Sequence, residues 1–432
     1  MRMSAAEWRG WILDRIGRLD AAPLPLELAH GRTLAEQVRS AHDLPLWHSS
    51  AMDGYALRAA DTAHATAERP VELVVSGEVL AGGSADPAIA PGAAVRIMTG
   101  APVPSAADAV VPVELTAAPG REDPGADPWG RGAVRIEAPV APGANIRRRG
   151  EDVRAGSLLA RSGDPLTAAR VSALAAAGVA EVRASELPRV AVLVTGAELR
   201  PPGAPLARGQ IVESNSLLIA GLLRESGIEP SAVRRCTDDV AAVRAQLDEL
   251  GRGCDAIITT GGVGPGSHDV VRLAVQAEPE VRAARVAVRP GQPQCAGRLA
   301  SGAWLFALPG NPVSAATSFE LFVRPALLAC QGRDDPMRPL VPAVAGVGWR
   351  GARGRLQLMP VTIDDADADG AGDGSGIRGG RRRLVCRPAV NPRGVSHAVG
   401  GHGAVQAYAV AGEDRGDVAA GEPVELLLVG LA

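Results

Sequence analysis

Four short segments hold the side chains best suited to chemistry, and each lies where a strand-like run gives way to a turn. The segments are Thr195–Glu198, Thr237–Asp239, Gly261–Asp269 and Pro309–Ser314. Their glycines let backbone N–H groups approach an anion closely, and a helix that begins directly afterwards adds a favourable dipole. Their carboxylates are hard oxygen ligands of the kind that Mg²⁺ prefers. The combination predicts a phosphorylated or nucleotide-like ligand bound together with a divalent cation.

The candidate residues divide into two groups according to their chemistry. The candidate metal ligands are Glu198, Asp238 and Asp269. The candidate ligand-binding residues of the glycine-rich and proline-rich loops are Gly261, Gly262, Gly264, Ser267, Pro309, Gly310, Asn311, Pro312 and Ser314.

Each of these residues also has a purely structural interpretation. Asp238 and Asp239 immediately precede a predicted helix, and an N-cap aspartate stabilises a helix by about 1 kcal/mol. Asp269 can stabilise the first turn of the following helix, Glu198 can be a solvated carboxylate, and most glycine-rich stretches are tight turns. The recurrence of carboxylates at corresponding ends of several strand–helix units favours a binding site over separate structural explanations.

Three further strings stand out in the first half of the chain. SSAMDGYAL (49–57) places an Asp53-Gly54 turn between apolar residues, and TGAPVP (99–104) is a turn stiffened by proline. GANIRRRGEDV (143–153) sets three arginines beside two carboxylates, which predicts either an exposed ion-pair ribbon of little energetic value or an anion-binding strip.

The elements that must position these residues form a multidomain chain. From Arg189 onward, apolar strands alternate with amphipathic helices, which predicts a parallel three-layer α/β domain over 186–332, with its ligands beyond the carboxyl ends of the strands. The other predicted parts are a helical N-terminal domain from 1–45 and 141–185, a β-rich domain inserted at 46–140, and a C-terminal β-barrel over 333–432. Residues 119–132 read as an exposed hairpin loop, and 364–383 as an acidic, glycine-rich insertion followed by arginines.

Composition excludes several classes of function. All 45 basic residues are arginine, so neither a Schiff-base lysine nor the lysine of a P-loop is available. A net charge of -3 indicates neither a nucleic-acid-binding polycation nor an acidic tail. The five scattered cysteines favour a reducing cytoplasm over a disulfide framework. No apolar run approaches the roughly 18–20 residues of a membrane-spanning helix, and the amphipathic N-terminus is not typical of a signal peptide.

Six strings together resemble the MoeA family, the molybdopterin molybdenumtransferases related to the gephyrin E domain. They are SSAMDGYA, RIMTGAPVPSAADAVVPVE, NIRRRGEDV, GQIVESNS, TTGG and LPGNPVSAATSF, which occur here in the order typical of that family. The resemblance runs from about residue 40 to 330 and implies an elongated, four-part, dimeric architecture.

The resemblance implies an activity and a set of site residues. It implies insertion of molybdate into adenylylated molybdopterin with Mg²⁺ and release of AMP. Asp53 and Thr99 match catalytic positions of the β-rich domain, and the family's catalytic carboxylate positions fall on Glu198, Asp238 and Asp269. Arg285 and Arg289 match substrate-binding positions that usually carry lysine, and they keep the positive charge needed to hold molybdate or phosphate. Pro309 and Pro312 would shape a loop lining the molybdate and pterin pocket. The family further implies a homodimer with a site shared between subunits, and molybdopterin adenylyltransferase and molybdoenzymes as possible partners.

Three positions depart from the pattern of the family. Gly264 replaces a serine, Ala197 replaces an aspartate, and Gln292 replaces a lysine. One hydrogen bond lost to a charged group costs about 1.5–3 kcal/mol. The leading hypothesis is therefore an active molybdenumtransferase with its carboxylates intact, and the alternative is a catalytically weakened paralogue that acts as a molybdopterin-binding scaffold or carrier.

Overall fold

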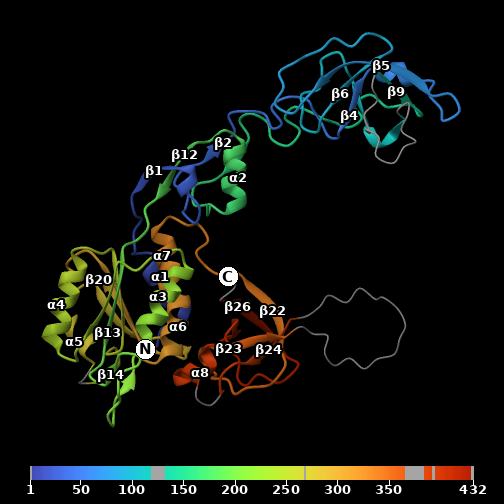
Figure 1. Ribbon diagram of the computed structural model, residues 1–432. Coiled ribbons are helices and arrows are strands. Elements are labelled where there is room, and N and C mark those ends of the chain that lie inside the picture. Colours follow the sequence, from blue (N-terminus) through green and yellow to red (C-terminus); the bar gives the residue numbers. More distant parts are fainter. Residues whose placement is uncertain (1, 118–131, 267–268, 365–383, 392–394, 430–432) are drawn as a thin grey trace, which may run out of the picture.

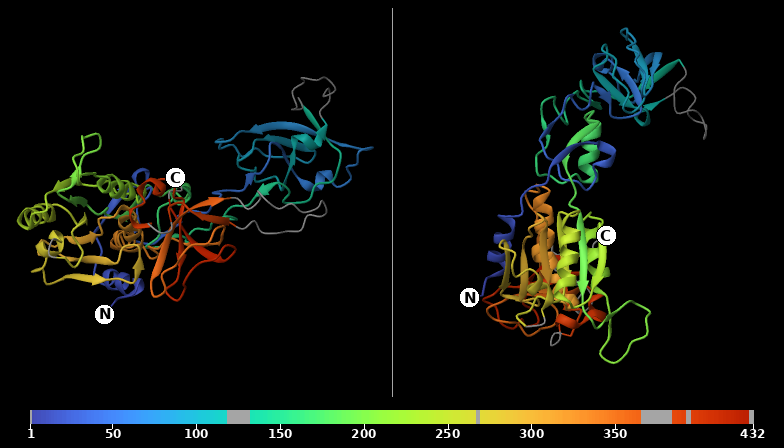
Figure 2. Two further views of the ribbon diagram at one scale, coloured as in Figure 1. Left: turned by 90° about the horizontal axis from the view of Figure 1, so that it is seen from below. Right: turned by 90° about the vertical axis from the view of Figure 1, so that its left-hand side faces the viewer.

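The chain forms an elongated molecule with four structural units, seen in the computed structural model of Figure 1. The structure describes residues 2–117, 132–266, 269–364, 384–391 and 395–429. An α/β unit and a barrel-like unit lie together at one end, a connecting unit follows, and a β-rich unit lies at the far end in all views (Figures 1 and 2). The loop predicted at 119–132 and the insertion predicted at 364–383 lie, apart from their end residues, outside the described residues.

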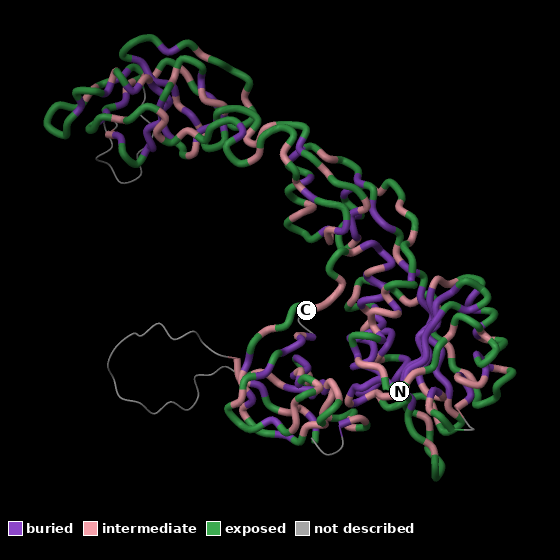
Figure 3. Tube along the Cα trace, turned by 180° about the vertical axis from the view of Figure 1, so that it is seen from behind, coloured by how far each residue is buried: buried purple, intermediate pink, exposed green. Residues whose placement is uncertain are grey.

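The α/β unit is built on a six-stranded sheet with the order β16-β13-β17-β21-β20-β18. Its parallel strands are β13 (Val190–Thr195), β16 (Ala232–Cys236), β17 (Ala256–Thr260) and β21 (Trp304–Leu308). Its antiparallel strands are β20 (Pro293–Arg298) and β18 (Val281–Arg285). The strands β13, β17 and β21 are buried along their whole length, as Figure 3 shows in purple, because helices cover both faces of the sheet.

Helices form the outer layers of the α/β unit. One face packs against α1 (Ala5–Leu13), α3 (Asn215–Glu225), α6 (Pro312–Ser318), the π-helical η4 (Phe319–Val323) and α7 (Arg324–Cys330). The other face packs against α4 (Val240–Gly251) and α5 (Val270–Ala274). Two short strands, β14 (Leu199–Arg200) and β15 (Ile211–Val212), pair beside the carboxyl edge of the sheet. The alternation seen in the sequence therefore produces three layers, but the sheet is mixed rather than wholly parallel as predicted, because β18 and β20 form an antiparallel hairpin at its edge.

The connecting unit differs from the predicted helical domain. It contains one helix, α2 (Ala168–Ala176), and two antiparallel strand pairs. The pairs are β1 (Ala21–Pro25) with β12 (Glu181–Ser185), and β2 (Val38–Arg39) with β11 (Leu158–Ala160). The expectation that the first 45 residues are helical is wrong beyond Leu13, because Pro23 and Pro25 favour extended backbone.

The N-terminal helix also packs differently from the prediction. The predicted domain grouped this helix with residues 141–185, but Trp8 and Ile12 are buried in the core of the α/β unit. The aromatic rings of Trp8 and Trp11 stack at 5.1 Å, and Trp11 makes an edge contact with Trp304 of β21. The helix therefore stabilises the sheet that carries the site.

The β-rich unit contains a six-stranded sheet with the order β7-β4-β6-β5-β9-β8. Its strands are β4 (Gly54–Leu57), β5 (Val71–Val79), β6 (Ala93–Ile97), β7 (Ala109–Pro112), β8 (Thr116–Ala117) and β9 (Ala133–Ile136). A small pair, β3 (Ser49–Ser50) with β10 (Ile146–Arg147), lies where the chain enters and leaves the unit.

The C-terminal unit is a barrel-like sheet with the order β19-β23-β24-β22-β26-β25, and a further pairing of β23 with β25 closes it. Its strands are β19 (Val288–Arg289), β22 (Leu340–Ala345), β23 (Leu356–Asp364), β24 (Leu384–Pro388), β25 (Ala407–Ala411) and β26 (Pro423–Leu428), with a short helix α8 (Val399–His402). The strand β19 comes from the segment predicted to belong to the α/β domain, so that domain contributes one edge strand to the barrel-like sheet.

Among the described residues, one helical stretch is long and apolar enough to cross a membrane by length and composition. It comprises the 19 residues Pro312–Cys330, and 89% of its most apolar window is buried inside the protein. This stretch is the central helix of the α/β core.

Candidate active site

A pocket of about 400 Å³ opens at the carboxyl ends of β13, β17 and β21. Since parallel strands present their carboxyl ends at one edge of a sheet, this is where loops from distant parts of the chain meet. Among the predicted site residues, those that line the pocket are Glu198, Asp238, Gly261, Gly262, Asp269, Gly310 and Asn311. The structure thus gathers the three candidate metal ligands around one cavity.

The three carboxylates differ in how far their oxygens are already used. Asp238 Oδ2 accepts a hydrogen bond of 2.7 Å from the backbone N–H of Ala197. Asp269 accepts two backbone N–H groups within its own loop, whereas the Glu198 carboxylate makes no side-chain hydrogen bond or ion pair among the described residues. The neighbouring Asp239 is the N-cap residue of α4, accepting from Ala242 N at 2.7 Å. Asp239 is therefore the helix N-cap that the structural interpretation assumed, whereas Asp238 is not an N-cap residue.

Two glycines bring backbone to the floor of the pocket. Gly261 and Gly262 have φ angles of 92° and 65°, which L side chains rarely adopt. A Cβ at Gly261 would lie 3.0 Å from the Thr195 carbonyl oxygen, and one at Gly310 would lie 3.3 Å from Gly261 Cα. Three loops approach each other at this point, and only glycine fits there.

The rest of the glycine-rich loop is folded around Asp269. Its carboxylate oxygens accept from Gly264 N at 2.6 Å and from Gly266 N at 2.7 Å. The guanidinium of Arg272 donates to the carbonyl oxygens of the same two glycines, at 2.9 Å each. Gly264 therefore shapes the loop and does not line the pocket, and Ser267 lies outside the described residues.

Three polar residues in the pocket wall were not among the predicted site residues. Thr195, Asn215 and Thr260 line the pocket, and Thr195 Oγ1, Asn215 Oδ1 and Thr260 Oγ1 are buried without a hydrogen-bond partner among the described residues. The Asn215 amide nitrogen donates to Gly310 O at 2.7 Å, which leaves its oxygen facing elsewhere. Buried polar atoms without partners are costly, so they mark where a polar ligand would bind. The string GQIVESNS carried the signal for Asn215.

The two arginines at predicted anion-binding positions lie beside this pocket rather than in its wall. Arg285 lies opposite Pro293, the first residue of β20. Because β20 runs antiparallel to β21, its first residue lies beside the carboxyl end of β21, and Arg285 is therefore at the same edge of the sheet as the pocket. Arg289 donates to Gly351 O at 3.1 Å. Burial, together with the nearby positive charges of Arg2, Arg289 and Arg285, lowers the pKa of Arg355. These four arginines therefore lie near one another around the sheet edge that carries Arg285, outside the lining of the pocket, and such a cluster favours an anion.

The remaining predicted loop residues, Pro309, Pro312 and Ser314, lie outside the wall of the pocket. Pro309 follows β21 directly, and Pro312 begins α6, where proline is tolerated because the first turn needs no donor. Ser314 is 3% exposed, and its carbonyl oxygen lies 3.3 Å from where a Cβ of Gly291 would be. None of these three residues lines the pocket.

Asp53 and Thr99 lie together at the other end of the molecule. Asp53 Oδ1 accepts from Thr99 N at 2.6 Å and from Thr99 Oγ1 at 2.7 Å. These hydrogen bonds lower the pKa of Asp53, the backbone one having the larger effect. The pair belongs to the β-rich unit, which the connecting unit separates from the α/β unit (Figures 1 and 2). Within one chain, Asp53 and the pocket carboxylates do not meet.

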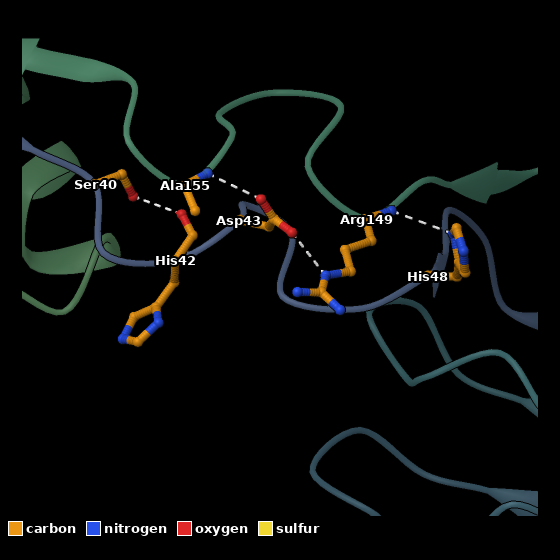
Figure 4. A network of polar contacts seen from close by, with 6 residues as sticks. All are labelled: Ser40, His42, Asp43, His48, Arg149 and Ala155. Carbon is orange, nitrogen blue, oxygen red and sulfur yellow. Dashed lines mark hydrogen bonds and ion pairs between the residues drawn. The ribbon is translucent and has the colours of Figure 1, made fainter.

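Hydrogen bonds join the two chain segments that lead into and out of the β-rich unit (Figure 4). Asp43 accepts from Arg149 Nε at 2.7 Å and from Ala155 N at 2.9 Å, and His48 Nδ1 accepts from Arg149 N at 3.2 Å. Arg149, one of the three arginines of the string NIRRRGEDV, therefore joins the two segments that connect the units.

Comparison with known proteins decides the family. The chain matches the model of the MoeA N-terminal region (domain I and II) over residues 3–178, and that of a probable molybdopterin-binding domain over 191–329. It is 42% identical over 347 residues to "Molybdopterin molybdenumtransferase 2" of Mycobacterium tuberculosis, covering 79% of this chain and 83% of the relative. The chain belongs to the MoeA family.

Other MoeA relatives agree over most of the chain. The "Molybdopterin molybdenumtransferase" of Haemophilus influenzae is 34% identical over 337 residues, which is 78% of this chain and 80% of that protein. The crystal structure of the "molybdopterin biosynthesis moeA protein" from Pyrococcus horikoshii OT3 has a TM-score of 0.78 and 28% identity, with 99% of this chain and 100% of that one covered. The MoeA fold, with a molybdopterin-binding-type α/β domain and a barrel-like sheet, is therefore common to both.

Proposed function

We infer that this MoeA protein is a molybdopterin molybdenumtransferase of molybdenum cofactor biosynthesis. The observation that carries this inference is the pocket at the carboxyl edge of the sheet, where carboxylates, a glycine pair and unpartnered buried polar atoms converge. The relatives at 34–42% identity carry the same activity in their names. The proposed reaction inserts molybdate into adenylylated molybdopterin and releases AMP.

The residues of the pocket are suited to the phosphate-bearing part of that substrate. The backbone at Gly261 and Gly262 lets phosphate oxygens approach, and the Thr195 and Thr260 hydroxyls can donate to them. The Asn215 oxygen can accept an N–H group of the substrate. The arginines beside the pocket supply the positive charge that an oxyanion such as molybdate requires.

The carboxylate oxygens of this pocket are suitable ligands for Mg²⁺, but protein groups alone do not complete the coordination of the ion. Among the described residues, no group of three or more His, Cys, Asp or Glu side chains could hold a metal by itself. Glu198 has a free carboxylate, whereas Asp238 and Asp269 keep only the lone pairs that their backbone hydrogen bonds leave. We propose that Mg²⁺ binds with the substrate, sharing its coordination with phosphate oxygens, and that it neutralises their charge when bound.

The test of this function is release of AMP. Purified protein is incubated with adenylylated molybdopterin, molybdate and Mg²⁺, and AMP is followed over time. AMP release that depends on molybdate supports the transferase. Binding of the pterin without AMP above background contradicts it and supports the alternative, a molybdopterin-binding scaffold motivated by Gly264, Ala197 and Gln292.

We further propose that two copies of the chain complete each site. Asp53 lies far from the pocket of its own chain, and exposed apolar side chains occur near both places. Ile211 lines the pocket and is 54% exposed, and Trp47 and Met52 near Asp53 are 49% and 40% exposed. A second copy related by a two-fold axis, with its β-rich unit at the pocket of the first, would cover both surfaces in each chain.

Mixing two inactive variants tests the shared site. Asp53→Asn removes the carboxylate of the β-rich unit, and Asp238→Asn removes a carboxylate of the pocket. When the two variants pair at random in an equal mixture, half of the dimers contain one chain of each, and every such dimer has one intact site. If random exchange occurs, about 25% of wild-type AMP release returns. No recovery, with mixed dimers shown by mass spectrometry, would place Asp53 and the pocket in the same chain. AMP release by the Asp53→Asn variant alone would remove Asp53 from the reaction.

A further inference from the structure

A second cavity, of about 320 Å³, lies at the opposite edge of the α/β sheet. It is formed where β13, β17 and β21 begin, together with the segment after α1 and the end of α4. Each of those strands has five or six residues, so its two ends lie roughly 17–20 Å apart. We call this cavity the arginine pocket, because its rim contains Arg18, Arg189, Arg252 and Arg298.

The rim of the arginine pocket carries an excess of positive charge. Asp255 is its one acidic lining residue, and it is already paired with Arg189, whose Nη2 lies 2.9 Å from Asp255 Oδ1. The Arg18 and Arg252 guanidinium groups form no ion pair with any described residue. Arg298 lies 4.0 Å from the well-exposed Glu280, a loose contact. The rim of the pocket therefore carries three exposed arginines, Arg18, Arg252 and Arg298, that have no strong acidic partner among the described residues.

The lining of the arginine pocket also includes apolar side chains and one unused donor. Ile16, Leu19, Leu327 and Cys330 form part of its lining. Trp304 also lines it, is 4% exposed, and has an indole Nε1 that is buried without a hydrogen-bond partner among the described residues. A buried N–H without an acceptor is costly in a native structure, and a ligand oxygen would satisfy it.

A neighbouring cavity of about 610 Å³ extends this space, since Arg298 and Trp304 line both. The Trp11 ring belongs to its wall, with the guanidinium carbons of Arg15 and Arg282 at 5.2 and 5.9 Å from the ring centre. The two cavities together have room for an organic group as well as an anion, in the size range of small-ligand sites.

We propose that the arginine pocket is a second ligand site that binds a small organic phosphate. Guanidinium groups match phosphate in geometry and charge, and three unpartnered positive charges favour a dianion over a monoanionic carboxylate. The apolar lining and Trp304 contact the organic part. The site is separate from the pocket at the carboxyl edge and works whether or not the molybdenumtransferase inference is correct.

Binding of phenyl phosphate to the full-length protein tests this proposal. Affinity is measured by isothermal titration calorimetry, and the site is located by hydrogen–deuterium exchange. We expect protection of residues 16–19, 251–256 and 298–304, and an affinity at least about fivefold higher than that for inorganic phosphate, because the ring is removed from water. The double variant Arg18→Gln/Arg252→Gln should weaken binding at least about tenfold, since two charge-assisted contacts are lost.

A matched double variant, Arg161→Gln/Arg244→Gln, removes the same charge from exposed positions outside the pocket and should bind like the wild type. Equal weakening in this control would show unspecific attraction and overturn the proposal. Protection confined to Thr195, Thr260 and Gly261, equal affinity for inorganic phosphate, or no binding at millimolar concentration would overturn it as well.

Discussion

Replacing Asp269 by asparagine is expected to suppress AMP release while leaving the fold intact. Asp269 is half-buried, and its two oxygens accept the N–H groups of Gly264 and Gly266 at 2.6 and 2.7 Å. Asparagine is nearly the same size but keeps only one acceptor oxygen. Its amide group would then face one backbone N–H, so one of the two contacts is lost and becomes repulsive.

The size of the effect follows from these contacts. A hydrogen bond to a charged group contributes about 1.5–3 kcal/mol, which corresponds to roughly 10- to 150-fold in a rate that depends on the loop geometry. The loop itself should persist, because Arg272 still donates to the carbonyl oxygens of Gly264 and Gly266. If Asp269 also shares Mg²⁺ with the substrate, the loss of its charge reduces the rate further.

The assay compares single-turnover AMP release in wild type, Asp269→Asn and the control Asp248→Asn, which removes an exposed carboxylate on α4. The rate should fall at least about tenfold in the first variant only. Circular dichroism should be unchanged in both, and the melting temperature should be unchanged in Asp248→Asn and fall by only a few degrees in Asp269→Asn. AMP release at the wild-type rate in Asp269→Asn would refute the role assigned to this loop, and a large fall in melting temperature would refute its local character.

Three other changes are expected to have measurable effects. Gly264→Ala should reduce AMP release like Asp269→Asn, because its Cβ would lie 2.9 Å from Asp269 Oδ1; wild-type turnover would contradict this. Thr99→Val should raise the pKa of Asp53 part of the way toward its ordinary value of 3.8, so deprotonation, followed by carboxyl-carbon NMR, shifts to higher pH; an unchanged titration would show that the hydroxyl has no influence. Asp43→Ala removes the acceptor of the hydrogen bonds from Arg149 and Ala155, so the distribution of distances between spin labels in the β-rich and connecting units should broaden. An unchanged distribution would mean that other contacts fix the position of one unit relative to the other.

The sequence predicted the α/β unit well because its signals are local. Buried strands such as β21 read as continuous apolar runs, and the loops that follow the strands carry the glycines and carboxylates that line the pocket. The connecting unit was mispredicted as helical because its short strands pair residues more than 100 positions apart, as Ala21 does with Ser185. Such pairings depend on tertiary contacts that periodicity does not record. Asn215 was missed for a similar reason, since its role depends on a contact with Gly310.

The structure also changes the meaning of Gly264. In the sequence, glycine at this position reads as the loss of a serine hydroxyl that would otherwise contact a phosphate. In the folded loop, a Cβ there would lie 2.9 and 3.0 Å from the two oxygens of Asp269, so the space that a side chain needs is already filled by the carboxylate. Glycine and the inward position of Asp269 are therefore coupled, and restoring serine alone would displace the carboxylate before its hydroxyl could serve a ligand. A chain with this loop must obtain its phosphate contacts from backbone N–H groups and from hydroxyls elsewhere, and the unpartnered Thr195 and Thr260 at the neighbouring strand ends are in position to supply them.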